Sequence, residues 1–351
     1  MSNKFFDLYI PSGYVNIKGI LEMGYPFNFI WGGRGTGKTY GALKTAIEDH
    51  KIIMYTRSKQ VQTDMVNQPE FSPFKKLNTD NNWNIQSFSL TKYNSAFYHA
   101  IVDENGKNKP DGLPIGYTSA LSTIANLRGF DASDVSLWIY DEFIPEKTEK
   151  PVKNACFAFL NAYETMNRNR EIQGKPPIQC LLLSNSENLS CDIFARLGLI
   201  RKVSDMTKNH KDRWYDRKRG IALFNLTDSP ISQEKKKTSL YNMVGEDSDF
   251  YKMSIENDFY AEDYSDISPQ NLKQYAPLVT IGELTIYDHK SGEYLYITKH
   301  RSGSPETYTL TDRDITAFKR AYNWVWESYI DGYVKFEDIE SKILLDMYFH
   351  M

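Results

Sequence analysis

Short apolar runs that end abruptly at glycine or at polar residues dominate the first part of the chain. Continuous apolar runs of about four to eight residues are typical of strands buried on both faces of a parallel sheet. Apolar residues at helical spacing follow residue 39 and recur over 152–167, where they predict helices with one packed face. Strands that alternate with helices indicate an α/β domain. The predicted strands lie at 27–31, 51–57, 87–90, 96–102, 135–142 and 178–183.

The pattern changes after residue 250. Apolar runs at 278–281, 284–287 and 294–298 predict strands, and helical spacing follows to the end, so we expect a small α+β domain. The composition of 226–250 is typical of a linker. A chain of 351 residues suits about two domains. We therefore expect a first domain over 1–215, a linker over 216–250 and a second domain over 251–351.

A glycine-rich turn follows the apolar run at 27–31 and leads directly into a helical pattern. Between Gly32 and Thr39 it has the G-x-x-x-x-G-K-[ST] spacing of a P-loop. Glycines let backbone N–H groups form a nest for phosphate oxygens, and the helix N-terminus adds its positive end. Lys38 would reach the β- and γ-phosphates of ATP, and the Thr39 hydroxyl would ligate Mg²⁺. The expected nucleotide-binding residues are Gly32, Gly33, Arg34, Gly35, Thr36, Gly37, Lys38 and Thr39.

Two carboxylates, Asp141 and Glu142, end the apolar strand at 135–142. On their own they could cap a turn, but downstream of a P-loop they form the Walker B pattern. Asp141 would hold Mg²⁺ through water, and Glu142 would polarise the attacking water as a general base. Together the two motifs predict an ATPase with ATP and Mg²⁺ as its cofactors.

The strand at 178–183 closes in Ser184 and Asn185. A polar residue at this place can act as a sensor that contacts the γ-phosphate or the attacking water, and we expect Asn185, or Ser184, in this role. Turn capping is the alternative. A P-loop strand, an acid-pair strand and a polar-tipped strand follow one another in this order in the additional-strand (ASCE) ATPases, which mostly act as ring or filament motors.

Arg168 and Arg170 follow the helix over 152–167. In a ring of subunits, an arginine at a helix end can reach the nucleotide of the neighbour as an arginine finger. The alternative is an ordinary cation that the helix dipole stabilises. We favour the finger, and Arg168 slightly over Arg170.

The net charge of −3 means that contact with nucleic acid must come from local patches. Arg57 and Lys59 follow the strand at 51–57, at the end where a parallel sheet meets its ligand. They would contact nucleotide or nucleic acid, or be solvated loop charges. Residues 201–220 are dense in cations with interleaved aromatics, which suits a nucleic-acid track or a solvated helical linker.

Composition narrows the class of protein further. Hydrophobic residues make up 41% and charged residues 25% of the chain, as in soluble globular proteins. The three cysteines lack C-x-x-C spacing, so we expect buried thiols and no zinc site. The N-terminus lacks a long apolar stretch, and no apolar run approaches ~18 residues, so neither a signal peptide nor a membrane span is expected.

Several short sequence segments closely resemble those of the DNA-packaging ATPases of phi29-like small tailed phages. They are the P-loop at 32–39, Tyr140–Ile144, Arg168–Glu171 and Leu183–Asn185. The C-terminal phrases Tyr308–Thr311 and Asp331–Phe336 are similar to that family too, so the resemblance spans nearly the whole chain. The pattern of Leu127-Arg128-Gly129, a short gap, an apolar strand and the acid pair resembles large terminase subunits and related helicase-like ATPases.

The resemblance implies a ring, taken to be a pentamer, that docks at the portal vertex of the empty head. This ring drives double-stranded DNA into the head with ATP, in the host cytoplasm, and is absent from the mature virion. Further partners would be the portal and a packaging RNA. The family match gives Arg168 the finger role and places Arg128 and Lys59 among residues that act across the subunit boundary. It also implies an RNase H-like C-terminal domain without its catalytic acids, so we expect no nuclease activity.

Two other functions fit parts of the pattern. A P-loop kinase for a small molecule would use the same loop, but it would need a substrate pocket and no neighbouring subunit. A helicase, or a terminase with an active nuclease, would share both motifs, and DNA cleavage with Mn²⁺ would support this alternative.

Overall fold

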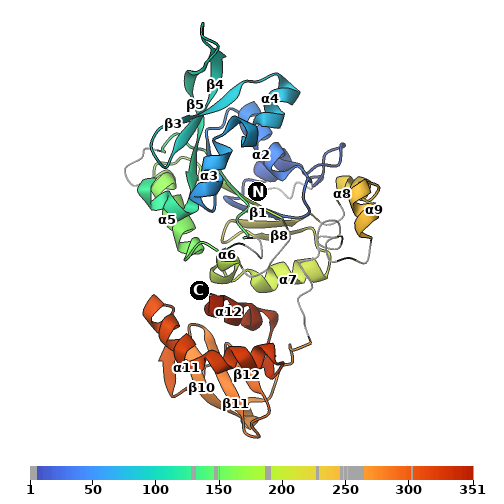
Figure 1. The fold of residues 1–351 in the computed structure, drawn as a ribbon, viewed down its shortest axis with the longest axis vertical. Helices are drawn as coiled ribbons and strands as arrows, with labels where there is room; N and C mark the ends of the chain where they lie inside the picture. The colour runs from blue at the N-terminus through green and yellow to red at the C-terminus, as the bar shows by residue number, and fades with distance from the viewer. Residues whose placement is uncertain are drawn as a thin grey trace. The chain divides into compact units, whose positions relative to one another are not determined.

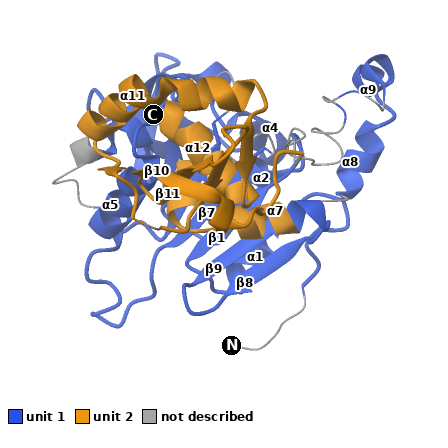
Figure 2. Ribbon diagram, turned by 90° about the horizontal axis from the view of Figure 1, so that it is seen from below, with its two compact units in different colours: residues 1–188, 206–260 blue, residues 189–205, 261–351 orange. Residues whose placement is uncertain are grey.

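The computed structural model describes residues 6–127, 132–145, 149, 151–185, 191–226, 229–245, 248, 251, 265–301 and 303–350. The chain forms two compact units, coloured separately in Figure 2. Unit 1 comprises residues 1–188 and 206–260, and unit 2 comprises residues 189–205 and 261–351. Each unit has its own sheet, and Figure 1 labels many of their elements.

Unit 1 is built on a nine-stranded sheet in the order β3-β4-β5-β2-β6-β7-β1-β9-β8. The inner strands from β5 to β9 are parallel, and antiparallel pairs flank them at both edges. The strands are β1 (Phe27–Trp31), β2 (Ile53–Arg57), β3 (Ile85–Ser89), β4 (Ser95–Val102), β5 (Asn108–Ala120), β6 (Leu137–Asp141), β7 (Gln179–Ser184), β8 (Arg213–Asp216) and β9 (Ile221–Asn225).

Helices cover both faces of this sheet, which explains why its central strands read as unbroken apolar runs. On one face, side chains such as Ile139 pack in one core with residues of α1, α2 and α4. On the other face, Trp138 stacks on Phe159 of α5 with ring centroids 4.8 Å apart. The helices of unit 1 are α1 (Ile17–Glu22), α2 (Lys38–Glu48), α3 (Gln60–Val66), α4 (Lys75–Asn81), α5 (Ala155–Asn167), α8 (Pro230–Lys235) and α9 (Ser239–Val244), with 3-10 turns η1 (Pro69–Phe71) and η2 (Leu121–Leu127).

Unit 2 is α+β, as the sequence predicts. Its mixed sheet has the order β13-β10-β11-β12-β14, with antiparallel pairs in the centre and parallel pairs at both edges. Phe318 of α11 is fully buried and contacts Phe349 of α12. The elements are β10 (Tyr275–Ile281), β11 (Leu284–His289), β12 (Leu295–Thr298), β13 (Glu306–Tyr308), β14 (Val334–Phe336), α6 (Asp192–Arg196), α11 (Asp312–Ile330), α12 (Ile339–His350) and the turn η4 (Leu272–Gln274); α7 (Ile200–Lys208) crosses the boundary between the units.

The division into domains differs from the one predicted. The predicted linker at 216–250 contains β9, which pairs in parallel with β1 inside the central sheet. It also contains α8 and α9. The polar composition of 226–250 reflects short exposed helices rather than a connector. Because of this composition, the buried strand just before these helices was assigned to the linker. Residues 189–205 belong to unit 2, although the sequence places them in the first domain.

Two smaller predictions also need correction. The strand predicted at 96–102 is followed by a further strand that the list of predicted strands lacks, because β5 begins at Asn108 and pairs with Val102. The cation-dense segment 201–220 is not one helical linker, since β8 occupies Arg213–Asp216 and pairs antiparallel with β9. None of the described helices combines the length and the apolar character that crossing a membrane requires.

Candidate active site

The P-loop joins the carboxyl end of β1 to the first turn of α2. Gly37 precedes the helix with a left-handed φ of +86°, which a side chain would make unfavourable. The helix then begins at Lys38, so the unpaired N–H groups of its first turn are available, together with those of the loop, to bind phosphate oxygens. This is the arrangement that the glycine spacing predicts.

Lys38 points back into the loop that precedes it. Its ammonium donates to the carbonyl oxygens of Gly32 at 2.8 Å and Gly33 at 3.0 Å, and it lies 3.4 Å from Asn185 Oδ1. The side chain is buried, and burial lowers the pKa of Lys38 to about 7, although the charges of Asp141 and Glu142 oppose this shift. The lysine is thus held in place by backbone carbonyls.

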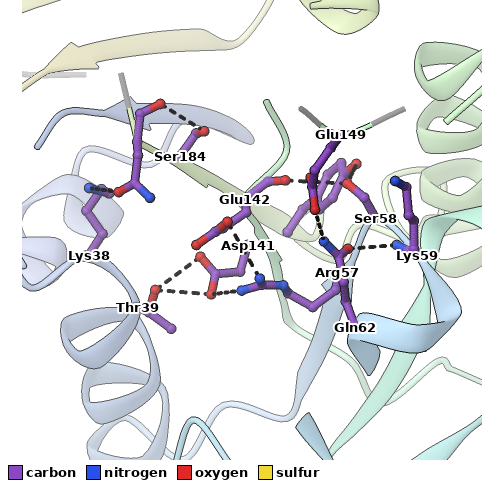
Figure 3. Close-up of polar contacts among 12 residues, drawn as sticks. Lys38, Thr39, Arg57, Ser58, Lys59, Gln62, Asp141, Glu142, Glu149 and Ser184 are labelled. Carbon is purple, nitrogen blue, oxygen red and sulfur yellow. Dashed lines mark hydrogen bonds and ion pairs between the residues drawn. The ribbon is translucent and has the colours of Figure 1, made fainter. Parts of the chain in front are cut away.

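Asp141, the last residue of β6, is the centre of a hydrogen-bond cluster (Figure 3). The hydroxyl of Thr39 donates to both carboxylate oxygens, at 3.0 and 3.1 Å. Tyr55 OH donates to Oδ2 at 2.7 Å, and Arg57 NH1 lies 3.2 Å from the same oxygen. Burial, and then the charge of Asp141, raise the pKa of Tyr55 well above its usual value, so this phenol stays a donor. These contacts fix one carboxylate next to the hydroxyl that the P-loop supplies.

Glu142 follows directly and differs from Asp141 in its exposure. Its side chain is 34% exposed, against 8% for Asp141, so water can reach it. The residue has a positive φ of 54°, which marks the sharp change of direction after β6. Arg57 NH2 lies 3.6 Å from Glu142 Oε2. One guanidinium therefore contacts both acids.

The polar tip of β7 distinguishes the two sensor candidates. Asn185 directs its side-chain oxygen at Lys38. Ser184 is buried, and its hydroxyl donates to the carbonyl of Asn185 at 3.1 Å. Asn185 is therefore the residue of this pair that faces the loop, while the hydroxyl of Ser184 bonds to the backbone at the end of the strand.

The two candidate finger arginines lie away from this cluster. Arg170 NH1 donates to the carbonyls of Ser133 and Val135, both at 3.0 Å, just before β6 begins. The loop and the acids lie at the other end of β6. Arg168 is exposed at the end of α5 with a φ of 43°, and its Nε donates to Thr165 O at 3.1 Å.

Of two further predicted residues, the structure describes one. Lys59 precedes α3, and its backbone N–H donates to Gln62 Oε1 at 3.0 Å, while Gln62 in turn donates to Glu149. Arg128 lies outside the described residues. The structure thus brings together Lys38, Thr39, Asp141, Glu142 and Asn185, and leaves Arg168 and Arg170 apart from them.

The sequence analysis did not predict the contact of Tyr55 with Asp141, and it left the role of Arg57 open. Both belong to β2, which pairs in parallel with β6, so their side chains stand beside the acid pair. The sequence contained a signal for these two residues. Tyr55 and Arg57 are two residues apart, so they lie on the same face of a strand that is otherwise a buried apolar run.

Comparisons with known proteins show which family and which solved structures the chain resembles. The model of the podovirus DNA encapsidation protein (Gp16) family matches residues 11–342. The fold is similar to the Phi-28 gp11 DNA packaging motor, with a TM-score of 0.65 and 19% identity over 96% of this chain and 97% of that one. It is also similar to the bacteriophage Phi-29 viral genome packaging motor assembly, with a TM-score of 0.63 and 20% identity over 98% and 99% of the two chains. No curated protein sequence matches the chain.

Proposed function

The chain belongs to the podovirus DNA encapsidation protein (Gp16) family, and from this we propose that it is the ATP-hydrolysing subunit of a motor that moves double-stranded viral DNA into an empty head. The cluster of Lys38, Thr39 and Asp141 carries the proposal. A loop lysine, a helix N-terminus and a hydroxyl bonded to a carboxylate form a receptor for a metal-bound triphosphate.

The residues of this cluster fit ATP and Mg²⁺. Thr39 and Asp141 bring a hydroxyl and a carboxylate within 3.0 Å, and such oxygens suit Mg²⁺, which keeps several of its waters. Bound Mg²⁺ would neutralise charge on the β- and γ-phosphates. Lys38 would exchange its carbonyl partners for phosphate oxygens. Asn185, which contacts Lys38, would report the presence of the terminal phosphate.

Glu142 would orient and polarise the water that attacks the terminal phosphate. It is the more exposed of the two acids, whereas Asp141 is buried among donors. Arg57 would act as a positioning residue, because its guanidinium contacts both carboxylates. We also assign the chain to the additional-strand ATPases, and the place of β7 between β6 and β1 supports this.

Arg168 would complete the site of a neighbouring subunit as an arginine finger. Its own P-loop lies at the opposite end of β6, a strand of five residues that spans about 16 Å. Arg170 instead ties the chain to the start of β6, which favours Arg168 over it. This division supports a ring of subunits over an isolated kinase.

We further propose that the ring is a pentamer that docks at the portal of an empty head in the host cytoplasm, with a packaging RNA as an additional partner. The similar motor structures named above support the oligomer and the DNA partner. Unit 2 would be a vestigial RNase H-like domain without nuclease activity, and DNA cleavage with Mn²⁺ would contradict this.

The test is ATP turnover by the full chain with and without double-stranded DNA, over a range of protein concentrations. We expect DNA to stimulate turnover, and we expect turnover to rise cooperatively with protein concentration. DNA affinity should fall by ~0.9 log units per log unit of salt for each phosphate contacted. Turnover that ignores DNA and scales linearly with protein would overturn the motor proposal.

A further inference from the structure

The segment that follows β9 is anchored beside the P-loop. Leu226 N–H donates to the carbonyl of Trp31 at 2.9 Å, at the point where β1 ends and the loop begins. Ser229 Oγ donates to the carbonyl of Gly13 at 3.4 Å. The next residue starts α8, which runs from Pro230 to Lys235. This helix is thereby held close to the loop.

Lys235, the last residue of α8, contacts the P-loop directly. Its ammonium donates to the carbonyl of Arg34. Gly35, with a φ of +72°, faces the same side chain, and a Cβ at this position would collide with the Lys235 ammonium. The carbonyls of Gly32 and Gly33 accept from Lys38. Two ammonium groups therefore sit on successive carbonyls of one phosphate-binding turn.

These two cations affect each other. Burial lowers the pKa of Lys235, and the positive charge of Lys235 lies close enough to that of Lys38 to repel it. The positive charge of Arg34, whose carbonyl accepts from Lys235, repels Lys38 in the same way. Among the described residues, Lys235 has no carboxylate within ion-pair distance. A bound polyphosphate would offset the repulsion between these positive charges.

We propose that Lys235 is a second ammonium ligand of the phosphate chain of the nucleotide, supplied from outside the P-loop motif. This assignment rests on the proposed function, because it needs a triphosphate in the loop. On binding, the ammonium exchanges the carbonyl of Arg34 for phosphate oxygens, as Lys38 does with its own carbonyl partners. The contact also links nucleotide occupancy to the segment that leads out of the central sheet.

The adjacent lysines provide matched controls because they point elsewhere. Lys237 Nζ pairs with Glu234 Oε1 at 3.2 Å, and Lys236 lies over the ring of Tyr251 at 5.9 Å. Removing Lys237 changes the net charge of α8 and its surroundings by the same amount as removing Lys235. It leaves the contact with Arg34 in place.

The experiment is isothermal titration calorimetry of the full-length protein with Mg²⁺ and a non-hydrolysable ATP analogue, AMP-PNP, with AMP as the comparison ligand. Lys235→Ala should raise the Kd for AMP-PNP roughly tenfold or more, because a charge-assisted hydrogen bond to phosphate is lost. It should change the Kd for AMP far less. Lys237→Ala should bind both as the wild type does, Lys235→Arg should retain most of the affinity, and Lys235→Glu should lose more than Lys235→Ala.

An unchanged Kd for AMP-PNP in Lys235→Ala would overturn the inference. A lower Kd would also overturn it, because Lys235 would then compete with phosphate for the loop. Far-ultraviolet circular dichroism confirms that each variant is folded, and Lys235→Gln replaces Lys235→Ala if the latter is not. Absence of AMP-PNP binding by the wild type would instead contradict the proposed function itself, so the two failures are distinguishable.

Discussion

The guanidinium of Arg57 lies 3.6 Å from the carboxylate of Glu142 and 3.2 Å from that of its neighbour Asp141. Burial alone would lower the pKa of Arg57, but the charges of Asp141 and Glu142 favour its charged form, so the group remains a cation. The fold itself thus sets the position of the acid that we assign to water activation. A side chain on β2 holds it before any nucleotide arrives.

Replacing Arg57 by glutamine should therefore affect both stability and turnover. Asp141 is largely buried, and removing its cation should lower the free energy of unfolding by about 3 kcal/mol, measured by urea denaturation. The ATP turnover rate should fall as well, since Glu142 loses its anchor. Arg57→Lys keeps the charge and should recover stability better than turnover, because an ammonium lacks the planar fork with which the guanidinium reaches both acids. Wild-type stability and turnover in Arg57→Gln would exclude this positioning role.

Glu142→Gln should bind ATP with near wild-type affinity and turn it over ~10² to 10⁴ times more slowly. The amide fills the same space but cannot accept the proton of the attacking water. A nucleotide titration and a steady-state phosphate-release assay measure the two quantities. Glu149→Gln, which replaces an acid bonded to Gln62, is the control and should keep its turnover. Retained turnover in Glu142→Gln would remove Glu142 from the mechanism.

Nucleotide binding should take up a proton at alkaline pH. Burial lowers the pKa of Lys38 to about 7, so the free site loses this proton as the pH rises above 7, and phosphate oxygens would raise the pKa again. Calorimetry in two buffers of different ionisation enthalpy should detect little uptake at about pH 6 and up to one proton at about pH 8. Lys38→Met should lose this uptake, and equal uptake in that variant would contradict the assignment.

The low pKa of Lys38 in the folded protein also makes the free energy of unfolding depend on pH. The unfolded chain keeps the ordinary lysine pKa of 10.5, so between about 7 and 10.5 it binds more protons than the folded protein. The contribution of Lys38 to the free energy of unfolding therefore rises with pH across this window and is constant below it. Comparing wild type with Lys38→Met by urea denaturation at several pH values isolates that contribution.

Arg168→Ala and Arg170→Ala should differ in kind. Loss of a finger costs about 10³- to 10⁵-fold in turnover, so Arg168→Ala subunits should poison wild-type rings out of proportion to their share. Arg170→Ala should mainly lower stability, because carbonyls of Ser133, Val135 and Pro176 lose their donor. Mixing experiments at fixed total protein give the first result and thermal unfolding the second. Strictly proportional loss with Arg168→Ala would indicate independent monomers.

Much of the candidate active site was predictable, because a P-loop requires a fixed spacing in sequence and the other motifs follow apolar strands. The P-loop, the acid pair after β6 and the polar tip of β7 each end an apolar strand, and parallel strands bring such ends to one edge of a sheet. Lys38, Asp141 and Asn185 are therefore close together in the structure, and their roles in catalysis remain predictions.

Contacts that depend on strand order were not predictable in this way. The neighbours of β6 follow from the sheet order, so the part of Tyr55 and Arg57 became clear only from the pairing of β2 with β6. The place of Lys235 depends on β9 joining the sheet, and the polar residues after β9 suggested a linker instead. The RNase H-like assignment of unit 2 remains a prediction from the resemblance.

The position of Arg168 at the far end of β6 from its own P-loop has a geometric consequence for assembly. If one copy presents this edge to the acid edge of the next, the contact is head-to-tail, and each added copy recreates the same unfilled surface. Only the rotation between successive copies then decides whether the series closes on itself or grows into an endless helix. A substitution that tilts this contact by a few degrees would convert a closed ring into an open helical fibre, although every chain would still be correctly folded.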